Sequence, residues 1–380
     1  MLIDETYEEV RVMKKRVVMV PLALGALLLV GGGKAVEGGY GINDAPRKLL
    51  NTDASPSTHA TSITYAAIFP PKSVRPLSET VSSSLKQDMP LLEAEAFDTE
   101  HKSGDNLRSV PLGQTLMAGE KDLSDGPLKK YRLVTFYGTP LSSQMGVLGE
   151  STPDEMMQQL KKQTEAYSIV DPSRPAVPTI ELVASVAQRD PGSNGLYVSW
   201  TPKSVIERYA ELAKNNKALL ILDVQLGRDS VMDEVKALSP FLKLPYVELA
   251  IDTEFHMGPG EVPGENLGQV DGSDIQHAIE FLNKLVKEEN IPDKVVMIHE
   301  FQKGIVTHKS LIKPTNHVEV VLNADGFGTP FDKLANYHTL VRNEPIQYGG
   351  FKLFYSEDRP LLSPKEVVSL DPAPAIVDYQ

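Results

Sequence analysis

The chain has 380 residues, a hydrophobic fraction of 41% and a formal net charge of −13. This length can form one large domain with additional segments, or two domains, and the hydrophobic fraction is typical of a globular protein. The negative charge argues against a nucleic-acid partner, which requires a basic surface. The sequence contains no cysteine, which excludes disulfides, thiolate metal ligands and thiol catalysis.

Residues 1–33 have the pattern of an export signal. Lys14-Lys15-Arg16 precedes an apolar run, 17–30, that is interrupted only by Pro21 and Gly25. The run is short for a membrane span and matches the hydrophobic segment of a signal peptide. No Ala-x-Ala site follows, so the segment is either a cleaved signal peptide or a retained anchor that holds the protein at the membrane. We therefore expect the rest of the chain to be extracellular or at the cell surface.

Residues 34–128 have the composition of a low-complexity linker. They contain the polar run 51–58, then Pro70-Pro71 and Ser82-Ser83-Ser84, and they show no sustained apolar period. We expect a mostly extended, partly ordered spacer here, with the folded domain beginning near residue 129.

From residue 129 to residue 380, predicted strands and helices alternate, which is typical of a parallel sheet in an α/β protein. Eight strands can be recognised, and eight strands close a (β/α)8, or TIM-type, barrel without an exposed edge. An open doubly wound sheet is the alternative. The predicted strands are 131–137, 179–185, 218–225, 246–254, 294–300, 318–325, 350–355 and 373–379, and the predicted helices are 152–167, 202–214, 230–238, 273–289, 331–341 and 363–370.

Two connections depart from the regular barrel pattern. The segment 301–315 carries no helical period, so the fifth helix is expected to be reduced or missing. The eighth predicted strand, 373–379, reaches the end of this sequence, so we expect the last helix to be missing as well. We expect the segment that precedes the first strand to cover the side of the barrel that this leaves open.

Polar residues concentrate at the carboxyl ends of the predicted strands, where a (β/α)8 barrel carries its active site. In the stretch 245–260, PYVELAIDTEFHMGPG, the apolar Val247, Leu249 and Ile251 alternate with three acids and an alanine. An ordinary buried strand does not carry unpaired carboxylates, because their burial is costly. The candidate catalytic residues are Glu254, Asp252, Asp325, Glu300 and Asp223, and the candidate substrate-binding residues are Tyr137, Glu181, Gln225, His256, His299, Asn323, Phe327 and Tyr355.

A pair of carboxyl groups can cleave a glycosidic bond. One is protonated and assists the leaving group, and the other is ionised and acts as nucleophile or base. Crowding of several acids raises the pKa of one of them and so provides the acid. We assign this role to Glu254, with Asp252 tuning it, and leave the second role open among the other three candidate acids. Only one of the neighbours His299 and Glu300 can point into the barrel.

The triplet Asp252-Thr253-Glu254 resembles the end of the Asp-x-x-Asp-x-Asp-x-Glu motif of chitinase-like glycoside hydrolases. The earlier motif aspartates fall on Val247 and Ala250, so the motif is incomplete. The region 131–380, with HMGPGEVPG and NADGFGTP, also resembles secreted bacterial proteins of unassigned activity. These resemblances imply an extracellular barrel, and the first implies carbohydrate, such as a cell-envelope glycan, as its partner.

Two other functions remain open at this stage. Asp252, Glu254, His256 and His299 supply the oxygen and imidazole ligands of a divalent-metal-dependent hydrolase, although no HExxH spacing is present. A non-catalytic barrel that binds a glycan or a protein is the second. No GxGxxG or GxxxxGK[ST] motif follows a strand, so a nucleotide site is not expected. The primary interpretation includes neither a metal nor a cofactor.

Overall fold

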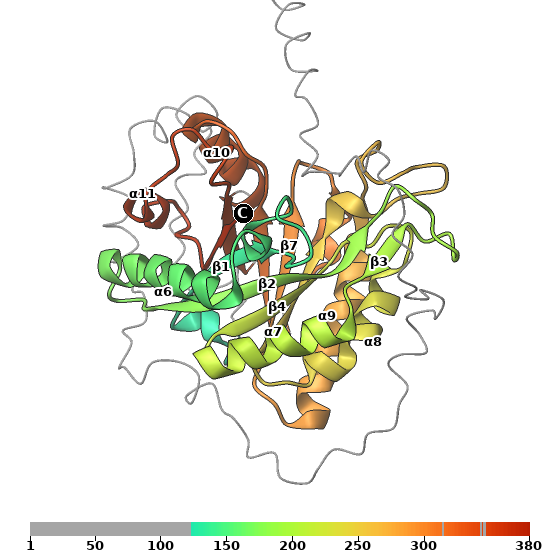
Figure 1. The fold of residues 1–380 in the computed structure, drawn as a ribbon, viewed down its shortest axis with the longest axis horizontal. Coiled ribbons are helices and arrows are strands. Elements are labelled where there is room, and N and C mark those ends of the chain that lie inside the picture. Colours follow the sequence, from blue (N-terminus) through green and yellow to red (C-terminus); the bar gives the residue numbers. More distant parts are fainter. Residues whose placement is uncertain (1–122, 314, 343, 345–346) are drawn as a thin grey trace, which may run out of the picture. The chain divides into compact units, whose positions relative to one another are not determined.

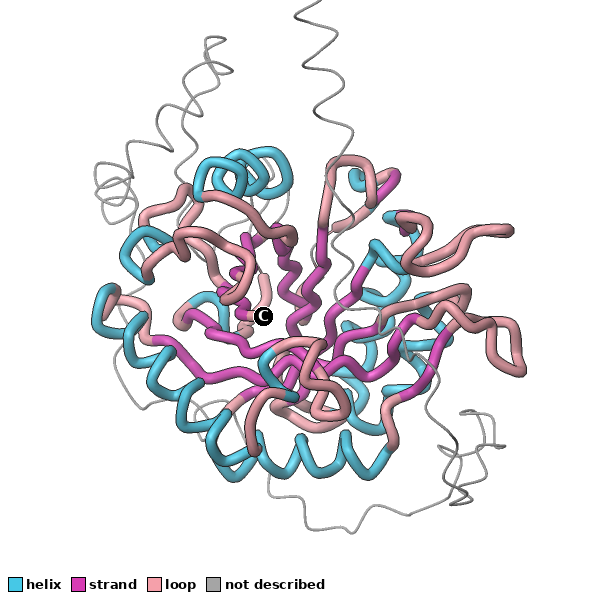
Figure 2. The backbone as a smooth tube through the Cα atoms, turned by 45° about the horizontal axis from the view of Figure 1, so that its top comes forward, coloured by secondary structure: helices cyan, strands magenta, loops and turns pink. Residues whose placement is uncertain are grey.

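The computed structural model describes residues 123–313, 315–342, 344 and 347–380. The predicted export segment and most of the predicted linker lie outside these residues. Within the described part, parallel strands form a closed ring that helices surround (Figures 1 and 2). The first strand pairs with both the second and the last, which closes the sheet. The prediction of a (β/α)8 barrel is confirmed, and the open sheet is excluded.

The eight barrel strands correspond one by one to the predicted strands, and each pairs in parallel with its neighbours. A ninth strand, β3 (Val198–Trp200), was not predicted. It pairs antiparallel with the carboxyl end of the second barrel strand. A separate pair, β6 (Val270–Asp271) and β8 (Val306–Thr307), joins two of the connecting loops. In order around the ring, the strands are β1 (Arg132–Gly138), β2 (Ala176–Ala187), β4 (Leu219–Val224), β5 (Val247–Asp252), β7 (Lys294–Glu300), β9 (Val318–Ala324), β10 (Tyr348–Leu353) and β11 (Ile376–Tyr379).

The helices begin where the sequence supplies capping residues. Thr152, Thr329 and Ser363 each form a capping box with the acid three residues later, and a proline follows each at the first helical position. No helix in the described ranges is long and apolar enough to cross a membrane. The α-helices are α6 (Pro153–Val170), α7 (Lys203–Asn216), α8 (Val231–Leu242), α9 (Gly272–Glu289), α10 (Pro330–Tyr337) and α11 (Pro364–Val368).

The connection between β7 and β9 departs from the regular pattern as expected. Its described residues contain β8 and a 3-10 turn, Lys309–Leu311, but no α-helix. A π-helical turn, His338–Arg342, extends α10. The sequence thus predicted both the regular crossovers and the irregular one.

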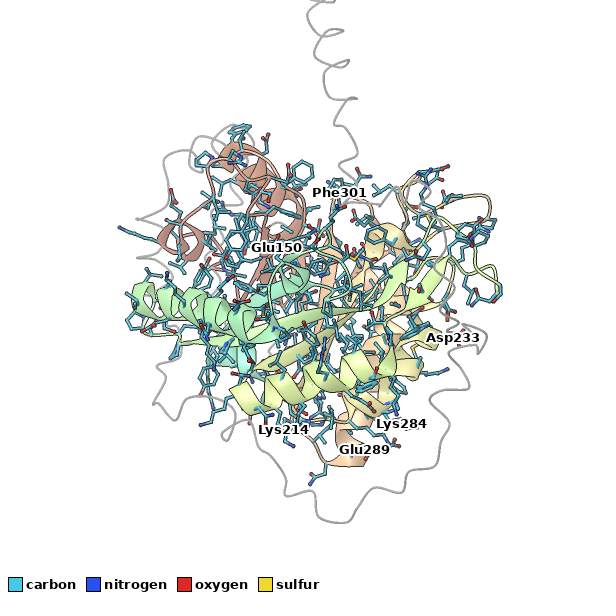
Figure 3. All side chains as sticks on the ribbon, in the orientation of Figure 1. Glu150, Lys214, Asp233, Lys284, Glu289 and Phe301 are labelled. Atoms are coloured by element: carbon cyan, nitrogen blue, oxygen red, sulfur yellow. The ribbon has the colours of Figure 1, made fainter. Side chains whose placement is uncertain are left out.

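The hydrophobic core lies between the barrel and the helices. Outward-facing strand residues such as Ile180, Leu222 and Ile298 are fully buried there. Charged side chains of the helices point away from this core, as Lys284 and Glu289 of α9 show in Figure 3. The side chains that alternate with this apolar set therefore fill the inside of the barrel.

Within the described residues, the outer face of β11 and β1 is covered by aromatic side chains. Tyr379 stacks on Tyr355 with ring centroids 5.0 Å apart, and Phe136 meets both rings edge-on. The hydroxyl of Tyr167 on α6 lies 2.7 Å from that of Tyr379. Tyr355 therefore packs outside the barrel, so its predicted role in binding substrate at the barrel mouth is wrong.

The described residues before β1, from residue 123 on, close the amino-terminal end of the barrel. The backbone N–H of Leu128 donates to Glu319 at 2.9 Å, and the hydroxyl of Ser124 donates to the same carboxylate at 3.3 Å. Glu319 lies at the start of β9 and is fully buried, as is Leu128 in the short 3-10 helix Pro127–Lys129. The last residues of the predicted linker are thus part of the folded domain.

The replacement Leu128→Ala should lower the free energy of unfolding by about 2–5 kcal/mol, because it leaves a cavity at a site that cannot collapse freely. Leu123 belongs to the same segment but is 66% exposed. Leu123→Ala is therefore the matched control and should change stability by less than about 0.5 kcal/mol. Urea denaturation of the full chain measures both, and equal effects would contradict the closing role of this segment.

Candidate functional site

The inside of the barrel carries a layer of polar side chains near the carboxyl ends of the strands. Each of the eight strands contributes one such residue, and two more follow directly after β4 and β9. All ten are buried. We call this set the interior cluster: Tyr137, Glu181, Asp223, Asp252, His299, Asn323, Lys352 and Asp378 from the strands, with Gln225 and Asp325 after them.

His299 lies at the centre of the interior cluster. Its Nε2 atom is 2.8 Å from Oε1 of Glu181 on the opposite side of the barrel, and its Nδ1 atom is 3.1 Å from Oδ2 of Asp325. Burial alone would lower the pKa of His299, but these two carboxylates raise it well above its usual value. Of the two neighbours His299 and Glu300, it is His299 that points inward.

Lys352 provides the second positive charge of the interior cluster. Its Nζ atom is 3.0 Å from Oδ2 of Asp325, 3.8 Å from Oδ2 of Asp378 and 3.7 Å from the ring centroid of Tyr137. Burial opposes the charged form, but the surrounding acids raise the pKa of Lys352 above its usual value. Sequence reasoning missed both Lys352 and Asp378. The available signal was their inward position at the ends of otherwise apolar strands.

Several acids of the interior cluster lack hydrogen-bond partners. Neither carboxylate oxygen of Asp223 has a hydrogen-bond partner, and the same holds for Asp378. Burial raises the pKa of Asp223 well above its usual value, and the nearby charge of Asp252 adds to the effect. Burial also raises the pKa of Asp252 to about 6, although His299 and Lys352 oppose it. The cluster thus holds more carboxyl groups than its two cations can balance.

Gln225 and Asn323 connect the charged members of the interior cluster. The amide of Gln225 donates to the hydroxyl of Tyr137 at 3.1 Å and to Asp252 at 3.4 Å. Nδ2 of Asn323 lies 3.3 Å from Nδ1 of His299. The structure therefore brings together eight of the thirteen predicted site residues inside the barrel: Tyr137, Glu181, Asp223, Gln225, Asp252, His299, Asn323 and Asp325.

Glu254 lies directly beside this cluster, on a different local structure from the one expected. Strand β5 ends at Asp252, and Glu254 occupies a 3-10 turn, Thr253–Phe255. The buried hydroxyl of Thr253 donates to the carbonyl oxygen of His299 at 2.6 Å, which fixes the turn to the next strand. The residue as a whole is half-buried, while its carboxyl group is closely surrounded by protein atoms. Burial first, and then Asp252 and Asp325, raise the pKa of Glu254 well above its usual value.

Besides Glu254 and Tyr355, three further predicted residues do not join the interior cluster. Glu300 faces the opposite way from His299 and pairs with Lys309 at 2.8 Å, so its predicted catalytic role is wrong. Burial raises the pKa of Glu300 to about 7, which Lys309 opposes. The Nδ1 atom of His256 is 2.7 Å from the carbonyl oxygen of Gln269, an interaction that orders its loop. Phe327 packs edge-on against the ring of Phe354.

Comparisons with known proteins add little to this geometry. No family model matches the chain, and no curated protein matches it. A solved structure similar to it is that of a GH18 chitinase from Pseudoalteromonas aurantia, with 9% sequence identity and a TM-score of 0.32 over 66% of this chain and 93% of that chain. The fold assignment therefore rests on the strand pairing, and the functional argument rests on the site.

Replacing Lys352 tests the electrostatic balance of the interior cluster. Lys352→Met should lower the free energy of unfolding by about 3–5 kcal/mol near neutral pH, because Asp325 and Asp378 then lose a buried cation. Lys284→Met is the control, since Lys284 pairs with Glu288 at 3.5 Å on the exposed face of α9 and such pairs contribute at most about 1 kcal/mol. Chemical denaturation compares the two, and a small loss for Lys352→Met would contradict the assigned role.

Proposed function

We propose that the barrel is an extracytoplasmic glycoside hydrolase, with Glu254 as the general acid and Asp325 as the ionised carboxylate of the pair. The observation that carries this proposal is that the charge of Asp325 acts on Glu254, and that the pKa values of the two acids are shifted in opposite directions. Burial and neighbouring acids raise the pKa of Glu254. Burial would also raise the pKa of Asp325, but Lys352 and His299 hold it well below its usual range. Environments that separate two pKa values in this way are how one site obtains both an acid and a base.

The positions of the two groups suit this division of roles. Glu254 is a half-buried residue on a turn after β5, at the carboxyl end of the barrel, where a general acid would donate its proton to the oxygen of a leaving group. Asp325 lies deeper and is fixed by His299, by Lys352 and by the backbone N–H of Gly326 at 2.7 Å. A carboxylate held in this manner stabilises the positive charge that develops on a sugar ring during cleavage. The resemblance of Asp252-Thr253-Glu254 to the chitinase-like motif agrees with this assignment of the acid.

Glu254→Gln keeps the shape of the side chain and removes the transferable proton. We expect turnover of a susceptible glycan to fall by about 10²–10⁴-fold, which is the usual contribution of a general acid. Folding should be unchanged or slightly improved, because one carboxyl leaves a repulsive group. Hydrolysis and binding are measured together on a panel of soluble and cell-envelope glycans.

Glu300→Gln is the matched control for this experiment, because Glu300 is a buried glutamate that lies outside the interior cluster. It should retain turnover. Full turnover in Glu254→Gln would remove Glu254 from the mechanism. Glycan binding without any turnover by the unmodified chain would instead favour a non-catalytic binding barrel.

We further propose that the barrel acts outside the cytoplasm, on the grounds of the cationic and apolar pattern in residues 1–33. In intact cells, an added protease should degrade the barrel while a cytoplasmic marker survives. Deletion of 1–33 should keep the barrel inside and protected, which provides the control. Recovery of the full-length chain only from the soluble cytoplasmic fraction would contradict an exported location.

A further inference from the structure

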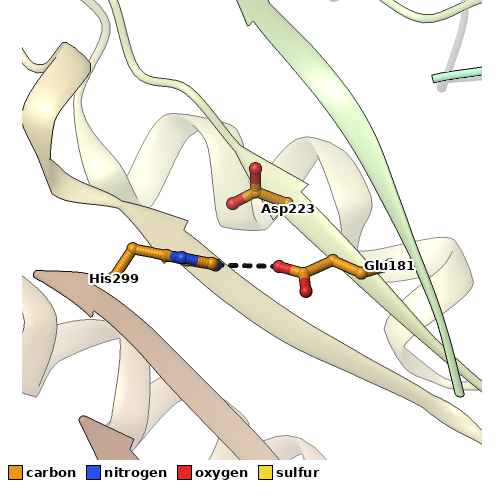
Figure 4. A group of neighbouring side chains, drawn as sticks. All are labelled: Glu181, Asp223 and His299. Carbon is orange, nitrogen blue, oxygen red and sulfur yellow. Dashed lines mark hydrogen bonds and ion pairs between the residues drawn. The ribbon is translucent and has the colours of Figure 1, made fainter. Parts of the chain in front are cut away.

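We propose that Glu181, Asp223 and His299 form a binding site for one divalent transition-metal ion inside the barrel. The three side chains come from β2, β4 and β7 and converge on one point (Figure 4). One potential ligand atom from each lies within 4.8 Å of the others, and all three residues are fully buried or nearly so. This site is distinct from the Glu254 turn and from the metal ligands that the sequence suggested, with which it shares only His299.

Asp223 provides the strongest evidence that something is bound here. It is fully buried, it points toward the pair formed by Glu181 and His299 (Figure 4), and neither of its oxygens has a hydrogen-bond partner in the structure. The second oxygen of Glu181, Oε2, also has none. Buried carboxylate oxygens without partners are rare because they forfeit hydration without compensation. A cation among these oxygens would compensate them directly.

His299 is oriented as metal-binding histidines are. Such a histidine commonly donates its other ring N–H to a carboxylate, which fixes the ring and its tautomer. Here Nδ1 faces Oδ2 of Asp325 at 3.1 Å, which leaves Nε2 directed at Glu181. The 2.8 Å contact between Nε2 and Oε1 of Glu181 is a hydrogen bond in this structure, and once Nε2 loses its proton the two atoms are close enough to bind one ion at about 2.0–2.2 Å each.

The charge of the interior cluster favours a divalent ion. Five fully or almost fully buried carboxyl groups face one lysine and one histidine, and the five acids are Glu181, Asp223, Asp252, Asp325 and Asp378. With His299 neutral as a ligand, five carboxylates and one lysine carry a net charge of −4, and a bound divalent ion would halve this excess without protonation of the acids.

The donor set indicates which ions fit. Two carboxylates and one imidazole suit Mn²⁺ or Zn²⁺, which accept mixed oxygen and nitrogen ligands. Ca²⁺ prefers six to eight oxygen ligands, and a fully buried imidazole does not belong to such a set. We therefore name Mn²⁺ and Zn²⁺ as the probes, with Ca²⁺ as the comparison ion.

The unmodified full-length chain gives the first test. After incubation with Mn²⁺ or Zn²⁺ and removal of free ion by gel filtration, elemental analysis should find about one equivalent per chain, lost on treatment with a chelator and accompanied by a lower melting temperature. Bound Mn²⁺ should also lose the six-line spectrum of the free aqueous ion in electron paramagnetic resonance. A metal content below about a tenth of an equivalent with both ions would overturn the site and leave protons to neutralise the acids.

Two aspartate variants then locate the ion. Asp223→Asn should weaken Mn²⁺ binding by at least about tenfold, because it removes a charged ligand. Asp378→Asn is the control, since Asp378 is equally buried and also without hydrogen bonds, but it pairs with Lys352 at 3.8 Å and lies outside the group of three. Its dissociation constant for Mn²⁺ should stay within about threefold of that of the unmodified chain. Equal losses in the two variants would place the ion elsewhere in the cluster and overturn the assignment.

The metal site and the proposed glycosidase activity can fail independently. Metal binding is read out without any substrate, and glycan turnover is read out on Glu254→Gln. A chain that cleaves glycans but binds no metal would reject only the metal site. A chain that binds one metal ion and cleaves no glycan would reject only the proposed hydrolase.

Discussion

The polar inside of this barrel depends on the ion pairs that the carboxylate of Asp325 forms. This carboxylate is shared by His299 and Lys352, and through the imidazole it is linked to Glu181 across the barrel. Removing such charges from water costs several kcal/mol per ion unless each is paired with good geometry. Asp325 provides that pairing for both cations, so the polar layer is sustained by contacts between strands that are distant in sequence.

In this arrangement, the barrel strands carry the interior cluster, and a turn beside them carries Glu254. The interior cluster contains one residue from every strand, and the closed sheet fixes each position. Glu254 instead lies on a 3-10 turn that is held by the hydrogen bond from Thr253 to the carbonyl oxygen of His299 and by the backbone N–H of Gly268, which donates to the carbonyl oxygen of Glu254 at 2.6 Å. The cluster thus raises the pKa of Glu254 through the charges of Asp252 and Asp325, in addition to the larger effect of burial. Residues that act on a substrate are commonly carried in this way, on loops held by a rigid scaffold.

The sequence predicts the barrel well because its strands carry a clear apolar period and its helices carry clear caps. The interior was harder to predict. Lys352 and Asp378 are isolated polar residues in apolar strands, and only closure of the sheet brings them beside Asp325 and each other. Glu300 and Tyr355 were misplaced because a pattern read along one strand does not show which neighbour points inward, or what packs outside the last strand. Such facts depend on pairing between distant segments.

The excess of acid inside the barrel connects the two proposals. If protons neutralise the surplus carboxyls, Asp223 is an uncharged acid, and the field at Glu254 comes mainly from Asp252 and Asp325. If a divalent ion neutralises them, a positive charge lies among Glu181, Asp223 and His299, and it lowers the cost of ionising Glu254. A bound metal should therefore make Glu254 a stronger acid and move its titration toward lower pH. The occupant of this site thus determines at which pH the proposed general acid carries its proton.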